Sequence, residues 1–136
     1  MSKTIIQKIV FKNTTPKALY ELYTNAEKHT IVTGAMAKNT AKEGAKFSAY
    51  DGYITGKNLQ LVKDRLIVQS WSGSDWKKED VDSTFTLHFE SKGKDTLLHV
   101  VHANLPDEHA KSIGNGWHEY YWTPWKAYLT AKSSKK

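Results

Sequence analysis

The sequence predicts an α+β fold in which a curved antiparallel sheet wraps around a long C-terminal helix. Segments with the composition of strands follow one another through the middle of the chain. Segments with helical spacing lie near the two ends. Strands joined by short turns, with the helices kept apart from them, are typical of an antiparallel sheet. The apolar face of the last helix is too wide for a flat sheet to cover, which predicts that the sheet is curved.

The N-terminal part of the chain reads as one strand followed by two short helices. Residues 4–11 are rich in β-branched and aromatic side chains, as strands are. Thr15 suits the N-cap of a helix, and Pro16 suits its first position, where no N–H is needed. Asn25 can cap a second short helix. The segment 33–45 has two glycines and no strong periodicity, so it predicts a loop.

The middle of the chain predicts strands joined by hairpin turns. Phe85, Leu87 and Phe89 alternate with polar residues, which is the pattern of a strand with one buried face. Asp51 and Gly52 form a dipeptide that is common in tight hairpin turns. The expected strands cover residues 47–50, 53–62, 65–71, 83–91 and 96–105.

A last helix is expected from about Ser112 to about Ala131. At about 100° per residue, its aromatic and apolar side chains cover an arc of roughly 200°, twice that of an ordinary surface helix. A curved sheet can cover such an arc on more than one flank. Pro124 lies inside this helix and cannot donate to the carbonyl of Tyr120, so we expect a bend there.

Length and composition favour one domain in a reducing compartment. The chain has 136 residues. We assign residues 1–131 to a single domain and expect the lysine-rich tail 132–136 to be disordered. No cysteine is present, which excludes disulfides and thiolate metal sites. The N-terminus lacks the apolar run of a signal peptide, and no segment approaches the ~20 apolar residues of a membrane span. A cytoplasmic protein without membrane association is therefore expected.

The positive charge of the chain does not predict nucleic-acid binding. The net charge is +6, from 20 Lys+Arg against 14 Asp+Glu. Arg65 is the single arginine, whereas nucleic-acid readers favour arginine for its planar fork. The lysines are scattered and no basic stripe is visible, so we expect no nucleic-acid partner.

The histidines predict neither a metal site nor a catalytic centre. His99 and His102 are three residues apart, which places them on opposite faces of a strand. No phosphate-binding loop or nucleophile motif is present, so we assign no catalytic residue, metal or cofactor. His118 lies inside the apolar arc of the last helix. It either borders a cavity as a base or donor, or it is a half-exposed residue at the edge of the arc.

Several segments together resemble a known family. GWHEYYWTPWKAYL (116–129) resembles the C-terminal helix of the activator of heat-shock ATPase homologue-like family. FSAYDGYITGKNLQLV (47–62) resembles its paired strands, and RLIVQSW (65–71) resembles its strand ending in tryptophan. This family is part of the helix-grip, START-like superfamily, with the polyketide cyclases and birch-pollen-allergen-like proteins. The resemblance covers nearly the whole chain and implies a helix-grip fold.

The aromatic helix leaves two structural interpretations and three functions open. Its rings either fill the core or line a cavity between helix and sheet. In the second case an apolar or aromatic small molecule would bind there. The expected ligand-binding residues are Trp71, Phe85, Trp117, His118, Tyr121 and Trp125. The alternatives are a chaperone-associated protein-interaction domain and a cyclase- or hydrolase-like enzyme using the same cavity. We expect binding without catalysis, because no second titratable group accompanies His118.

Overall fold

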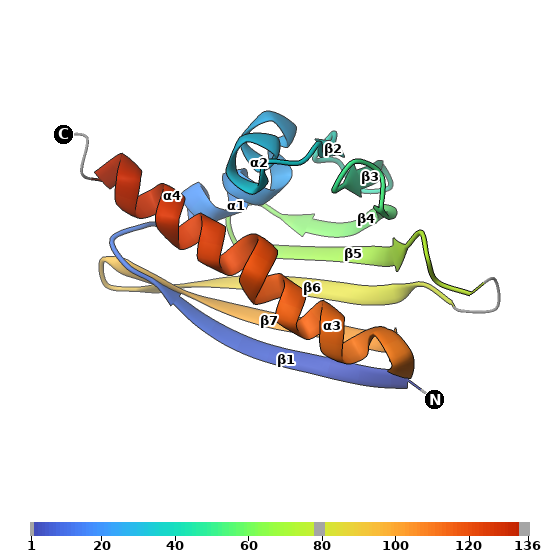
Figure 1. The fold of residues 1–136 in the computed structure, drawn as a ribbon. Helices are drawn as coiled ribbons and strands as arrows, with labels where there is room; N and C mark the ends of the chain where they lie inside the picture. The colour runs from blue at the N-terminus through green and yellow to red at the C-terminus, as the bar shows by residue number, and fades with distance from the viewer. Residues whose placement is uncertain (1, 78–80, 134–136) are drawn as a thin grey trace.

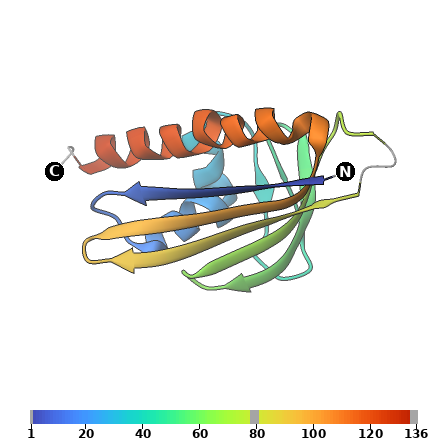
Figure 2. The same ribbon diagram turned by 90° about the horizontal axis from the view of Figure 1, so that it is seen from below.

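The computed structural model describes residues 2–77 and 81–133 and confirms the predicted fold (Figure 1). The C-terminal helix runs across one side of a curved antiparallel sheet, and the strands bend around beneath it (Figure 2). The sheet has seven strands in the order β1-β7-β6-β5-β4-β3-β2. Strands β2 to β7 therefore lie beside their neighbours in sequence, and β1 forms the edge of the sheet beside β7.

The elements follow the predicted order of strand, two short helices, further strands and a long helix. They are β1 (Ser2–Phe11), α1 (Pro16–Thr24), α2 (Ala26–Thr33), β2 (Lys38–Asn39), β3 (Lys46–Ala49), β4 (Ile54–Val62), β5 (Leu66–Gly73), β6 (Ser83–Lys92), β7 (Asp95–Pro106), α3 (Asp107–Trp117), the π-helical turn η1 (His118–Trp122) and α4 (Thr123–Ser133).

Both predicted caps of the short helices are confirmed. The Thr15 side chain accepts a hydrogen bond from the backbone N–H of Ala18 at 3.1 Å. Asn25 accepts one in the same way from Lys28 at 3.0 Å. The expectation of a continuous loop over 33–45 is wrong in one detail, because the two-residue strand β2 pairs with β3 there. A pairing this short leaves no periodic pattern in the sequence.

The C-terminal helix is longer than predicted at both ends. It begins at Asp107, five residues before the expected Ser112, directly after Pro106 ends β7. Two acidic residues in the first turn, Asp107 and Glu108, suit the positive end of the helix dipole. At the other end the helix continues to Ser133. The first two residues of the expected disordered tail are therefore helical, and 134–136 lie outside the described residues.

A π-helical turn lies just before Pro124, where the sequence predicted a disturbed helix. Residues His118–Trp122, just before the proline, have wider helical spacing, and the Thr123 N–H donates to the carbonyl of His118. Such a turn is a common response to a disturbed helical ladder. It leaves the helix continuous while changing the direction of the side chains around it.

The concave side of the sheet and the C-terminal helix enclose the core. Phe85, Leu87 and Phe89 of β6 are buried, as their alternation predicted, and His88 between them is exposed. Trp117 is 2% exposed, which confirms that the centre of the apolar arc is covered. Among the described residues, no helix is long and apolar enough to cross a membrane.

Candidate functional site

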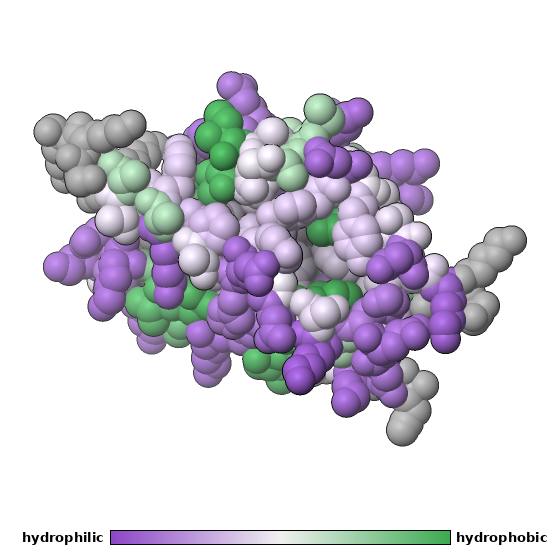
Figure 3. Space-filling view, viewed as in Figure 1, coloured by the Kyte–Doolittle hydropathy of each residue, from purple (hydrophilic) through white to green (hydrophobic). Residues whose placement is uncertain are grey.

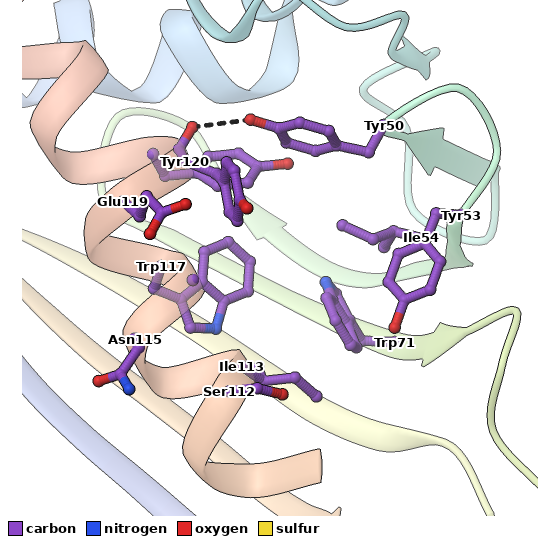
Figure 4. Close-up of a pocket in the computed structure, with 12 residues that line it drawn as sticks. Tyr50, Tyr53, Ile54, Trp71, Ser112, Ile113, Asn115, Trp117, Glu119 and Tyr120 are labelled. Atoms are coloured by element: carbon purple, nitrogen blue, oxygen red, sulfur yellow. Dashed lines mark hydrogen bonds between the residues drawn. The ribbon is translucent and has the colours of Figure 1, made fainter.

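A pocket of about 650 Å³ lies between the sheet and the C-terminal helix (Figure 4). The space-filling view shows a hollow on this side of the molecule (Figure 3). Three parts of the chain form the walls: the β3–β4 turn with the start of β4, the end of β5, and the helical segment around η1. The lining residues are Tyr50, Tyr53, Ile54, Trp71, Ser112, Ile113, Asn115, Gly116, Trp117, Glu119, Tyr120 and Tyr121.

Local structure explains how the two opposite walls acquire their rings. On β5, alternate residues face the concave side, so Ile67, Gln69 and Trp71 are all buried, and Trp71 stands nearest the end of the strand. On the helix, Ile113 and Trp117 are four residues apart and face the same way. The side chains that each element contributes to the pocket thus follow from the periodicity of that strand or helix.

The structure brings three of the six expected ligand-binding residues to the pocket. Trp71, Trp117 and Tyr121 line it. Phe85 lies beneath Trp117, with ring centroids 4.2 Å apart and planes at 5°, and is fully buried by that stacking. Phe85 is therefore a support for a lining residue and is not itself part of the wall.

The other two expected residues lie away from the pocket. Trp125 is 0% exposed and packs against Phe11 and Trp122 in the core. His118 is exposed to solvent and does not line the pocket, in agreement with the edge alternative. The π-helical turn begins at His118, so a wheel drawn for a regular α-helix does not give the directions of the side chains that follow.

Tyr50 and Tyr53 are lining residues that the sequence did not single out. The Tyr50 hydroxyl donates to the carbonyl of Tyr120 at 3.1 Å (Figure 4). That carbonyl lacks its usual helical donor because Pro124 has no N–H. The presence of Pro124 in the sequence therefore indicated that the carbonyl of Tyr120 would need a hydrogen-bond donor from outside its own helix. Burial is the main cause that raises the pKa of both tyrosines to about 12.

A buried histidine links the sheet wall to the helix wall. The Trp117 indole donates to Nδ1 of His102 at 3.1 Å, so Nδ1 carries no proton. The proton is then on Nε2, which donates to the Ser83 hydroxyl at 2.8 Å, and Ser83 donates to the carbonyl of Trp71. Burial lowers the pKa of His102 to about 3. The ring is neutral at pH 7 and holds the two tryptophans in fixed positions.

A second buried histidine holds Tyr121. Nδ1 of His29 donates to the carbonyl of Tyr23 at 3.0 Å, which leaves Nε2 as an acceptor for the Tyr121 hydroxyl, also at 3.0 Å. Burial lowers the pKa of His29 to about 4, against the opposing effect of its backbone hydrogen bond. Burial also raises the pKa of Tyr121 well above its ordinary value. Both groups are neutral at pH 7 and are committed to each other.

Two further polar groups complete the site. The Tyr53 hydroxyl donates to Asp75 at 2.6 Å. The indole nitrogen of Trp71 is buried and has no acceptor among the described residues. Within the described part of the chain, no cluster of three potential metal ligands is found.

Comparison with known proteins confirms the resemblance seen in the sequence. The family model "Activator of Hsp90 ATPase homolog 1-like protein" matches residues 13–130. A relative from Homo sapiens, activator of 90 kDa heat shock protein ATPase homolog 1, is 32% identical over 108 residues. That alignment covers 79% of this chain and 32% of the relative. The chain thus spans about a third of the length of this relative.

Solved structures show the same fold over nearly the whole chain. The crystal structure of an HSP90 activator from Plasmodium falciparum has a TM-score of 0.85 and 27% identity, and covers 93% of this chain and 96% of its own. CalU16 from Micromonospora echinospora has a TM-score of 0.74 at 21% identity, covers 88% of this chain and 71% of its own, and is similar in fold. From its motifs, its fold and the family model that matches most of its length, this chain belongs to the activator of Hsp90 ATPase homolog 1-like family.

Proposed function

We propose that this chain binds an apolar aromatic small molecule in the pocket between the sheet and the C-terminal helix. The observation that supports the proposal is a pocket of about 650 Å³ in which six of the twelve lining residues are tyrosine or tryptophan. Ligand sites of about 300–1,000 Å³ with mainly apolar and aromatic walls are common in proteins. Trp71 and Trp117 pack against each other in the lining, with ring centroids 5.8 Å apart. Tyr50, Tyr53 and Tyr120 are less buried and offer rigid rings to a flat molecule.

The division of the aromatic helix supports this proposal over a purely structural role. Trp122 and Trp125 lie in the core and stabilise the domain. Trp117 and Tyr121 belong to the same core and also line the pocket. Tyr120 lines the pocket as well and is 50% exposed, so this helix carries a ring that the core does not enclose.

Catalysis is not part of the proposal. His29 and His102 are the two buried histidines near the pocket, and each has both ring nitrogens bonded within the protein. Neither is free to exchange a proton with a molecule in the pocket, as a general base must.

A thermal-shift screen with a library of apolar and aromatic compounds tests the proposal. A compound that binds only the folded state raises the melting temperature, by the equivalent of about 2.7 kcal/mol at a hundred times its Kd. The variant Ile113→Trp enlarges a lining residue and should obstruct the pocket, so it should reduce the shift. Ile31→Trp is the matched control, because Ile31 is 65% exposed on α2 and does not line the pocket. No shift with any compound, or equal shifts in both variants, would refute pocket binding.

A chaperone-associated role is the second candidate. It is supported by the relative from Plasmodium falciparum, which is described as an HSP90 activator and is matched by this chain over 96% of its length. The test is the rate of ATP hydrolysis by purified Hsp90 with and without this chain. Stimulation that persists in Ile113→Trp would place the chaperone contact outside the pocket. No stimulation at saturating concentration would argue against this role.

A further inference from the structure

Building on the proposed ligand-binding function, we propose that the pocket selects an aromatic ligand that carries a positive charge. The ring of such a ligand would lie beside Tyr50, Tyr53 and Tyr120, and its ammonium group would lie at the mouth beside Glu119. Trp71 and Trp117 pack against each other, with ring centroids 5.8 Å apart, and leave no room for a ring between them. The reasons are the charge of the lining residues, the direction of their hydrogen bonds, and the π faces that they present.

The first reason is that, among the residues that the structure describes, the one charged side chain in the lining is acidic. The chain has 20 Lys+Arg, yet within 2–77 and 81–133 none of them lines the pocket, whereas Glu119 does. Figure 4 shows Glu119 on the helix wall, next to Trp117 and Tyr120. Glu119 is exposed, so its carboxylate is available to a group that enters from solvent. The other polar lining residues, Ser112 and Asn115, are neutral.

The second reason is that the rings of the wall have few donors left for an anion. Four of them already donate to acceptors within the protein: Tyr50 to the carbonyl of Tyr120, Tyr53 to Asp75, Trp117 to His102 and Tyr121 to His29. The neighbouring Glu119 carboxylate raises the pKa of Tyr120, so the Tyr120 hydroxyl keeps its proton. The indole nitrogen of Trp71 is uncommitted, but it is buried. Apart from the Asn115 amide, a carboxylate or phosphate would therefore meet mostly π faces and oxygen lone pairs, which repel it.

The third reason is that the same surfaces attract a cation. The faces of tryptophan and tyrosine carry negative charge density and bind ammonium groups, with an affinity gain of about two- to fivefold at exposed sites. The phenol oxygens keep lone pairs that can accept from an ammonium. Asp75 at 2.6 Å from the Tyr53 hydroxyl adds negative charge behind that ring. Glu119 can accept a charge-assisted hydrogen bond, which at an exposed position contributes about another two- to fivefold.

The test compares three probes of nearly equal shape: 2-naphthylmethylammonium, 2-naphthylmethanol and 2-naphthoate. Binding is followed at pH 7 and low ionic strength from the indole NMR signals of Trp71 and Trp117 in ¹⁵N-labelled protein. We expect the ammonium probe to bind about five- to tenfold more tightly than the alcohol, and the carboxylate to bind most weakly. Equal or tighter binding of the alcohol, or tightest binding of the carboxylate, would overturn the inference.

Two variants test whether Glu119, at the mouth of the pocket, causes the preference for the ammonium probe. Glu119→Gln should reduce the ammonium-to-alcohol ratio to about twofold, the part due to the π faces. Glu27→Gln is the matched control, because it removes the same charge from an exposed position on α2 outside the lining. It should leave the ratio unchanged. An unchanged ratio in Glu119→Gln, or an equal drop in Glu27→Gln, would overturn the role of Glu119.

Failure of the charge preference and failure of ligand binding give different results. If the alcohol binds and shifts both indole signals but the ammonium has no advantage, the charge preference is refuted while pocket binding stands. If no probe shifts either signal and the compound library leaves the melting temperature unchanged, the proposed function is refuted together with the preference.

Discussion

Truncation of Trp117 to alanine should cost about 3–5 kcal/mol of the free energy of unfolding, the usual range for a buried large aromatic ring. Trp117 is 2% exposed and stacks on Phe85 at 4.2 Å and on Trp122 at 5.5 Å. Its removal therefore takes a stacking partner from each of these two rings. The pocket lies directly beside the ring, so water can enter the new space, and we expect a value in the lower half of the range.

Replacement of Trp117 by phenylalanine separates the hydrogen bond from the packing. Phenylalanine keeps most of the stacking surface but removes the indole donor that reaches His102 at 3.1 Å. A buried acceptor left without its donor costs about 1–3 kcal/mol. Trp117→Phe should therefore be destabilised by an amount in that range, and by less than Trp117→Ala.

Urea unfolding followed by circular dichroism measures both variants without depending on tryptophan fluorescence. Tyr120→Ala is the control, because Tyr120 lies on the next turn of the same helix and is 50% exposed. It should lose less than about 1 kcal/mol. A loss below about 1 kcal/mol in Trp117→Ala would show that the ring lies outside the core and that the position of the helix on the sheet is wrong.

Two other predictions concern acid stability and the closest approach within the sheet. The pKa values of His29 and His102, about 4 and about 3, lie below the unfolded value of 6.5, so protons bind to the unfolded chain first. Stability should be fully present above about pH 6.5 and fall below it, by up to about 1.4 kcal/mol per pH unit for each ring. Urea titrations at pH 7 and pH 5 would contradict this if they gave equal stability. Gly56→Ala should cost about 3 kcal/mol, since an added Cβ would lie 1.8 Å from the carbonyl oxygen of Ser70; a loss below about 1 kcal/mol in urea unfolding would refute this close approach.

The charge preference of the pocket would also narrow the search for a natural ligand. A preference for cations in a chain of net charge +6 must be local, because the overall field repels positive ligands. Its strength should therefore fall as salt screens Glu119, while any contribution from the π faces persists. Repeating the probe titrations at high ionic strength separates the two contributions.

The elements of the fold could be predicted from the sequence because each depends on neighbouring residues. Thr15 and Pro16 start α1 through contacts within one helical turn. The alternation around Leu87 predicts which face of β6 is buried. The wide aromatic arc predicted a curved sheet, since an arc of roughly 200° needs cover on more than one flank. Even the disturbance of the last helix could be predicted, because Pro124 acts on its own turn.

The site itself depended on the tertiary structure. Periodicity gives the direction of a side chain from its own element, but it does not give the distance to the opposite wall. Trp71 and Phe85 both point to the concave side, yet Trp71 lines the pocket and Phe85 lies under Trp117. Tyr50, about seventy residues away in sequence, reaches Tyr120 because the strands curve around the helix.

The burial of the two histidines was likewise decided by tertiary packing. The sequence analysis did not single out His29, and it placed His102 only on a strand, on the face opposite His99. Each became buried when distant segments closed over it, and each remained neutral because burial penalises its charged form. Sequence patterns therefore determined the elements and the faces that they bury. Whether two such faces meet in contact or leave a pocket between them is a property of their separation in space, which no local pattern records.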